Sequence, residues 1–151
     1  MVDSAADNKA LVRQYLETLW AQGDPAVAEA FLAPHYQRHL TPHTPPLPRA
    51  GFRQRLARFR AAFTDQQHTL DDLFAEGDRV AIRVTIRGTH HGVFHGIAPT
   101  GKAVTVSLVE ILRMGGGKIT ESWGGVDLAD LLRQLGAVRS VDPDVQEGHP
   151  R

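Results

Sequence analysis

Apolar residues recur at helical spacing through most of the N-terminal third of the chain. The stretch DNKALVRQYLETLWAQGD predicts a helix that ends at Gly23, because its apolar positions form one stripe: Leu11, Val12, Tyr15, Leu16 and Leu19. A second helix is predicted for PAVAEAFLA, which begins at Pro25 and stops before Pro34. FRQRLARFRAAF, residues 52–63, predicts a third helix with phenylalanines and Leu56 on one face and arginines on the other.

Prolines interrupt the chain between the second and third predicted helices. The segment HYQRHLTPHTPPLPRAG holds four of them, which predicts an irregular loop with room for a short strand over residues 36–40.

From residue 68 onward the apolar period changes from that of a helix to that of a strand. HTLDDLFAEGDRVAIRVTIRGTHHG predicts two strands joined at Gly77, and KAVTVSLVEILRM and KITESWGGVD predict two more. DLADLLRQLGA predicts a final helix that Asp127 caps and Gly136 ends. The order predicts an α+β fold, with three N-terminal helices packed on one side of a curved, mostly antiparallel sheet.

The turn between the last two strands decides which side chains share a face. A two-residue turn at Gly116-Gly117 would place Glu110 opposite Trp123, and both would then point inward with Asp127. A three-residue turn would place Glu110 on the other face. We favour the first register because it collects the apolar residues on one face.

Under the favoured register the outer face of the sheet keeps an apolar patch: Thr105, Val109, Ile111 and Val126. An exposed patch of this kind predicts a homo-oligomer, a dimer or a tetramer.

Composition narrows the function classes. The 151 residues suit a single domain over residues 1–138, followed by a polar tail over residues 139–151 that we expect to be flexible. Seventeen basic residues balance seventeen acidic ones, and no apolar run could span a bilayer, so no nucleic-acid or membrane partner is expected. Cysteine is absent, which excludes thiol chemistry and fits a cytoplasmic protein. The eight histidines show no metal-binding spacing, so no metal site is expected.

The stretch GIAPTGKA, residues 96–103, contains the phosphate-loop pattern G-x-x-x-x-G-K. A phosphate loop needs a hydroxyl residue after the lysine and a helix beyond it, whereas Ala103 and a strand-like segment follow Lys102. Pro99 also lacks an N–H to donate to a phosphate. The pattern therefore predicts a loop between two strands.

The same region resembles a known family. GTHHGVFHGIAPTGK, the strand ending EILR, GKITESW and DLADLLRQLG, together with LVRQYLETLWAQGD and HYQRHL, are similar to the SnoaL-like polyketide cyclases of the NTF2-like superfamily. The resemblance implies a cone-shaped α+β barrel around an apolar pocket. It also implies intramolecular aldol ring closure by an acid/base carboxylate, with no metal or organic cofactor. Isomerases, epoxide hydrolases and hydroxylation-assisting proteins share the fold, as do non-catalytic modules, so these alternatives stay open.

The resemblance supplies three expected catalytic residues. Asp127 matches the family's acid/base position, although capping of the last helix would also explain it. His90 matches the GTH motif and His39 matches the histidine after the second helix, although each could be structural. We expect these residues to line the pocket: Trp123, Glu110, Tyr15, Leu108, Phe94 and His35. If Asp127 only caps its helix and the histidines face solvent, a non-catalytic binding module is favoured.

Overall fold

The computed structural model of the protein describes residues 4–22 and 28–137. Its elements are α1 (Ala5–Gln22), α2 (Ala28–Phe31), β1 (Leu32–His39), β2 (Leu47–Pro48), α3 (Arg49–Ala62), β3 (Gln67–Glu76), β4 (Arg79–Thr89), β5 (Ala103–Gly115), β6 (Lys118–Val126) and α4 (Leu128–Gln134). The end of the first helix at Gly23 and the tail over residues 139–151 lie outside the described residues. None of the described helices is long and apolar enough to cross a membrane.

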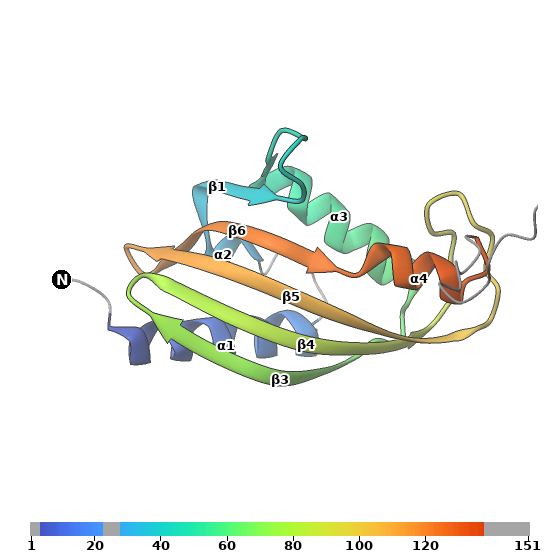
Figure 1. Cartoon of the computed structure of the whole chain (residues 1–151), viewed down its shortest axis with the longest axis horizontal. Helices are drawn as coiled ribbons and strands as arrows, with labels where there is room; N and C mark the ends of the chain where they lie inside the picture. The colour runs from blue at the N-terminus through green and yellow to red at the C-terminus, as the bar shows by residue number, and fades with distance from the viewer. Residues whose placement is uncertain (1–3, 23–27, 138–151) are drawn as a thin grey trace, which may run out of the picture.

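The strands form one sheet in the order β2-β1-β6-β5-β4-β3, antiparallel except where β1 runs parallel to β6. Helix α1 packs along β3 and β4, α3 packs beside β1, and α4 continues from the end of β6 (Figure 1). One face of the sheet is therefore covered by helices, as the sequence predicts. The α+β fold is confirmed.

The second predicted helix ends earlier than expected, at Phe31, because β1 begins at Leu32 and continues through Pro34. The strand is longer than the short stretch expected over residues 36–40. Leu32 pairs with Ile119, and regular pairing with β6 resumes only at Gln37. This irregularity accommodates Pro34, which has no N–H to give to the ladder.

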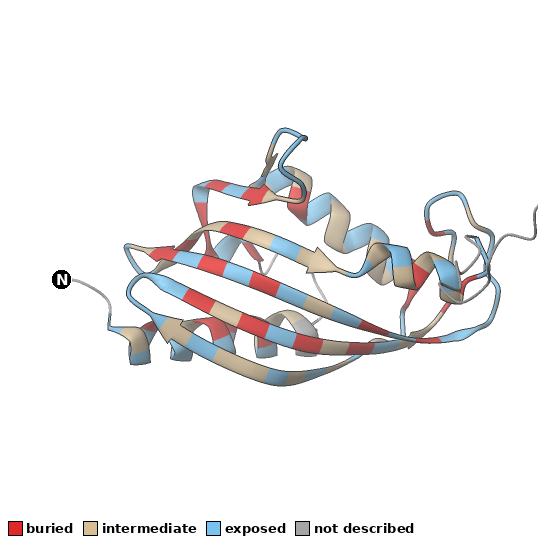
Figure 2. Ribbon diagram, viewed as in Figure 1, coloured by how far each residue is buried: buried red, intermediate tan, exposed pale blue. Residues whose placement is uncertain are grey.

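Alternation along the long strands separates a buried face from an exposed one. Buried and exposed positions follow one another along β4 and β5 in Figure 2. The buried face of these strands is almost entirely apolar: Val80, Ile82, Val84, Ile86, Val104, Val106, Leu112 and Met114. Glu110 lies in the same phase and is buried with them, as predicted.

The phosphate-loop pattern lies in the β4–β5 connection. The His90 N–H donates to the Lys102 carbonyl at 2.9 Å, and the Gly101 N–H donates to the His90 carbonyl at 3.0 Å. Strand β5 follows at Ala103, so the segment is the inter-strand loop that the sequence predicts.

A β-bulge at Thr120 changes the register of the last hairpin. The turn is the predicted one, since Gly115 pairs with Lys118, but two residues further Arg113 pairs with Glu121. Thr120 is thus an extra residue in β6, and its hydroxyl donates to the Arg113 carbonyl at 3.3 Å.

The bulge turns the following side chains of β6 over. Trp123 pairs with Ile111 on the outer face, and Glu110 pairs with Gly124 instead. Val126 points inward, where the sequence placed it outward. The predicted pairing of Glu110 with Trp123 was wrong, because one inserted residue exchanges the two faces of a strand.

Gly124 permits a close approach that no other residue could make. Its φ is +100°, and a Cβ there would lie 2.3 Å from the Val109 carbonyl oxygen. Only a residue without a side chain can therefore lie directly opposite Glu110.

We expect Gly124→Ala to destabilise the protein more than Gly116→Ala. Both glycines have positive φ, which costs about 1–2 kcal/mol for alanine, but a Cβ at Gly116 meets nothing within 4 Å. The clash at Gly124 should add about 1–3 kcal/mol. Urea denaturation of both variants measures the difference, and equal losses would contradict the close approach.

Candidate functional site

A cavity of about 960 Å³ lies between the helices and the inner face of the sheet. Side chains from α1, α3, β4, β5, β6 and the β4–β5 loop form its walls, and most of them are apolar. The apolar lining includes Leu16, Leu19, Phe52, Leu56, Phe59, Val84, Ile86, Val93, Phe94, Leu108 and Val126. Such a cavity suits a small organic molecule.

A buried ion pair interrupts this apolar wall. Arg38 Nη1 lies 2.7 Å from Glu110 Oε1, and the side chains are only 5% and 9% exposed. Arg38 Nη2 donates to the Gly124 carbonyl at 3.2 Å, and the guanidinium lies 4.5 Å from the centre of the Phe52 ring. Burial lowers the pKa of Arg38, but the charges of Glu110 and Tyr36 and the hydrogen bonds to both residues together outweigh it, and the pKa is raised. The guanidinium of Arg38 is therefore charged at neutral pH.

Arg38 keeps spare capacity for hydrogen bonding. Its Nε is buried and finds no acceptor among the described residues. On the carboxylate, only Oε1 of Glu110 is engaged by the described part of the chain.

Hydroxyl groups surround the pair. The Tyr36 hydroxyl hydrogen-bonds Ser122, which β6 turns inward after the bulge. Tyr15 lines the cavity, and its hydroxyl makes no hydrogen bond to another described residue. Burial, and next the Glu110 charge, raise the pKa of Tyr15 well above its ordinary value. Tyr15 therefore remains a proton donor at neutral pH.

His68 also lines the cavity and is uncharged at neutral pH. Burial, and next the charge of Arg60, lower its pKa to about 4. It can therefore accept or donate a hydrogen bond there without adding positive charge.

Four of the predicted site residues meet at this cavity: Tyr15, Phe94, Leu108 and Glu110. Trp123 and His39 instead lie on the other face of the sheet, where their rings stack at 5.2 Å. His39 Nε2 lies 2.6 Å from Glu121 Oε2, and the Arg79 guanidinium lies 5.1 Å from the centre of the Trp123 ring. The bulge places Trp123 there, so the prediction that it faces the cavity was wrong.

Asp127 is exposed and caps α4. Its Oδ1 accepts a hydrogen bond from the Asp130 N–H at 3.0 Å. Val126 and Leu128 line the cavity, but Asp127 between them does not. The capping role that the sequence left open is the one that the geometry supports.

His90 is fully buried and packs against Phe63. Its Nδ1 accepts a hydrogen bond from the Thr100 N–H at 3.1 Å. It is not among the residues that line the cavity, and it fastens the loop that carries Phe94. Its position is that of a structural support.

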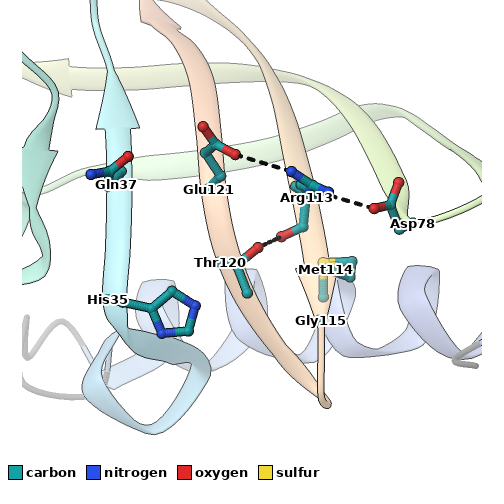
Figure 3. A pocket seen from close by; sticks show the side chains of 8 residues that line it. All are labelled: His35, Gln37, Asp78, Arg113, Met114, Gly115, Thr120 and Glu121. Carbon is teal, nitrogen blue, oxygen red and sulfur yellow. Dashed lines mark hydrogen bonds and ion pairs between the residues drawn. The ribbon is translucent and has the colours of Figure 1, made fainter. Parts of the chain in front are cut away.

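His35 lines a second, smaller hollow of about 490 Å³ beside the β5–β6 turn (Figure 3). Arg113 lies there between two carboxylates, with Nε 3.1 Å from Asp78 Oδ2 and Nη1 3.6 Å from Glu121 Oε1. Asp78, Glu121 and Arg113 are thus already engaged in ion pairs with one another.

No group of three or more metal-binding side chains occurs within residues 4–22 and 28–137. Within the part of the chain that the structure describes, the cavity lining holds one carboxylate, which is already paired with an arginine. The arrangement supports acid/base chemistry on an organic molecule.

Comparison with known families decides the identity of the fold. The model of the SnoaL-like polyketide cyclases matches residues 10–135. The chain belongs to this family. Comparison with the curated proteins found no match.

Solved structures of SnoaL-like proteins agree with this membership. AclR from Streptomyces galilaeus, a candidate hydroxylase, is 31% identical over 93% of this chain and 91% of its own, with a TM-score of 0.82. TsrD from Streptomyces laurentii is 32% identical over 85% and 97%, with a TM-score of 0.74. IdmH from Streptomyces antibioticus, a candidate polyketide cyclase, is 30% identical over 85% and 98%, with a TM-score of 0.72.

Sequence reasoning missed Arg38, the most buried charge of the SnoaL-like cavity. It lies between His35 and His39 in HYQRHL, and only these two histidines of the segment are predicted as site residues. The sequence did hold a signal for it. Arg38 lies two residues after Tyr36, so in a strand both side chains point to the same, buried face.

We expect Glu110→Leu to lower the free energy of unfolding by about 3–5 kcal/mol, because it leaves the Arg38 charge buried without a partner. The double variant Arg38→Met/Glu110→Leu should recover most of that loss. A double-mutant cycle by urea denaturation measures the coupling. Additive effects of the two substitutions would show that the pair does not interact.

Proposed function

We propose that the protein is a SnoaL-like cyclase that closes a ring by acid/base, aldol-type chemistry in a polyketide-like or other oxygenated apolar molecule. The observation that carries this proposal is the buried Arg38–Glu110 pair in the wall of an otherwise apolar cavity. Glu110 is the base, and Arg38 and Tyr15 hold the oxygen on which negative charge develops.

The proposed step begins when the Glu110 carboxylate removes a proton from a carbon next to a carbonyl group. Arg38 and Tyr15 stabilise the enolate oxygen, since both donate hydrogen bonds in a water-poor cavity. The enolate carbon attacks a second carbonyl of the same molecule, and the resulting alkoxide recovers the proton from Glu110. Nothing is oxidised or reduced, so the proposal needs no cofactor.

A carboxylate is a weak base, which restricts the substrate. The proton that Glu110 can remove readily lies between two carbonyl groups, as in a chain of alternating ketones. The apolar walls would fold such a chain so that the reacting carbons approach each other, which replaces a bimolecular encounter by a positioned one.

The likeness to AclR, a candidate hydroxylase, supports a second reading in which the same residues assist a hydroxylation. Isomerisation and epoxide opening also need an acid and a base. Asp127, His90 and His39 do not converge on the cavity, which on its own favours a non-catalytic binding module. The Glu110 carboxylate in the cavity wall is the reason that catalysis remains the stronger proposal than binding alone.

We expect Glu110→Gln to reduce turnover by about 100-fold or more, the usual contribution of a general base, with ligand affinity nearly unchanged. Asp127→Asn should retain turnover, because its carboxylate lies outside the cavity lining. Incubation with poly-β-ketone substrates and mass spectrometry of the products measures both. Normal turnover in Glu110→Gln would remove it from the mechanism, and loss in Asp127→Asn would restore the acid/base role expected from the family.

The outer face of the sheet supports a homodimer. A row of mostly uncharged side chains crosses five strands in register: Phe74, Ala81, Ile111, Trp123 and His39. Phe74 is 64% exposed and Ile111 is 42% exposed, which is costly in a monomer. A two-fold axis along β5 would set β4 over β6 of a second copy, so that Arg79 meets the partner's Glu121.

We expect Ile111→Lys to convert the dimer to a monomer, because it places two charges at the centre of the buried face. Ala57→Lys, on the exposed side of α3, is the matched control and should leave the dimer intact. Sedimentation at micromolar concentration measures both, and a monomeric wild-type protein would refute the interface.

The remaining expectations stay proposals. Zero net charge argues against nucleic-acid and membrane partners. The absence of cysteine is compatible with the cytoplasm.

A further inference from the structure

Helix α3 lines the cavity with three arginines, Arg55, Arg58 and Arg60. Among the described residues, the sole carboxylate in the lining belongs to Glu110, which is paired with Arg38. The cavity therefore carries a surplus of positive charge, although the chain as a whole is neutral.

These three arginines differ from their neighbours on the same helix. Arg53 forms an ion pair with Glu29 at 2.9 Å, and Arg49 donates to the Leu32 carbonyl at 3.3 Å. Arg55, Arg58 and Arg60 make no hydrogen bond or ion pair with any described residue. The arginines of α3 that line the cavity are thus unpaired among the described residues, and the two that do not line it are paired.

The unpaired charges also act on one another. Burial lowers the pKa of Arg55, and the nearby charges of Arg38 and Arg58 lower it further. A positive cluster that disfavours its own ionisation is relieved when an anion binds. The planar guanidinium group matches the oxygens of carboxylates and phosphates.

We propose that the ligand of this cavity carries an anionic group, a carboxylate or a phosphate, which the arginines of α3 hold while its apolar body fills the cavity. The proposal rests on the proposed function only in taking the cavity as the substrate site. It adds the charge of the substrate, which ring closure does not require.

Two fluorescent probes of nearly equal shape test the charge preference. 1-Anilinonaphthalene-8-sulfonate carries one negative charge, and N-phenyl-1-naphthylamine is the same aromatic system without it. We expect the sulfonate to bind about tenfold more tightly or better, with an affinity that falls as salt is raised. The affinity of the neutral probe should not depend on salt.

Variants of α3 locate the effect. Arg55→Gln and Arg58→Gln should each weaken sulfonate binding about tenfold, as expected for one charge-assisted hydrogen bond, with the neutral probe unchanged within about twofold. Arg53→Gln is the matched control on the same helix and should change neither. Equal affinity for both probes, or an equal response of Arg53→Gln and Arg55→Gln, overturns the proposal.

Displacement of the sulfonate by 2-naphthoate or by 2-naphthyl phosphate identifies which anion the cavity prefers. Displacement by either supports the proposal, and displacement by neither overturns it. These measurements need no turnover. If the wild-type protein binds both probes equally but turns over substrate normally, only the anionic ligand is rejected. If it prefers the sulfonate but Glu110→Gln turns over substrate normally, only the proposed mechanism is rejected.

Discussion

The ion pair between Arg38 and Glu110 is the interaction on which the cavity depends. Removing each charge from water costs several kcal/mol, so the pair is tolerable only if its geometry and remaining hydrogen bonds are good. For Arg38, the 2.7 Å contact with Glu110 and the hydrogen bond to the Gly124 carbonyl meet this requirement. Strands β1, β5 and β6 each supply one participant, so the registers of three strands must agree for the pair to form.

The bulge at Thr120 makes that agreement possible. Without the extra residue, β6 would place Trp123 opposite Glu110, and an indole would occupy the space that Gly124 leaves to Arg38. With it, Ser122 and Gly124 face inward and the bulky aromatic ring faces outward. One inserted residue thus leaves space for Arg38 on the inner face of the sheet. It also places Trp123 in the exposed row of the outer face that supports a dimer.

The sequence predicts the parts of this structure that depend on local order. The helices, the long strands, the turn at Gly116-Gly117 and the SnoaL-like family all follow from periodicity and motifs. The bulge does not, since Thr120 carries no local signal and a single slip exchanges both faces. The pairing of Arg38 with Glu110 joins residues 72 apart, which no local pattern reveals. Periodicity places the arginines of α3 on the face opposite its phenylalanines, but it cannot distinguish bulk water from a cavity beside that face.

The two candidate carboxylates differ in what already satisfies them. Asp127 accepts a hydrogen bond from the first turn of α4, so its Oδ1 is already occupied as the cap of that helix. Its exposure adds hydration that a substrate would have to displace. Glu110 is held by one guanidinium through Oε1, in a wall that is otherwise apolar and away from bulk water. A proton transferred to Glu110 stays within reach of the substrate. Arg38 keeps its positive charge and can then stabilise the substrate oxygen to which the negative charge has moved.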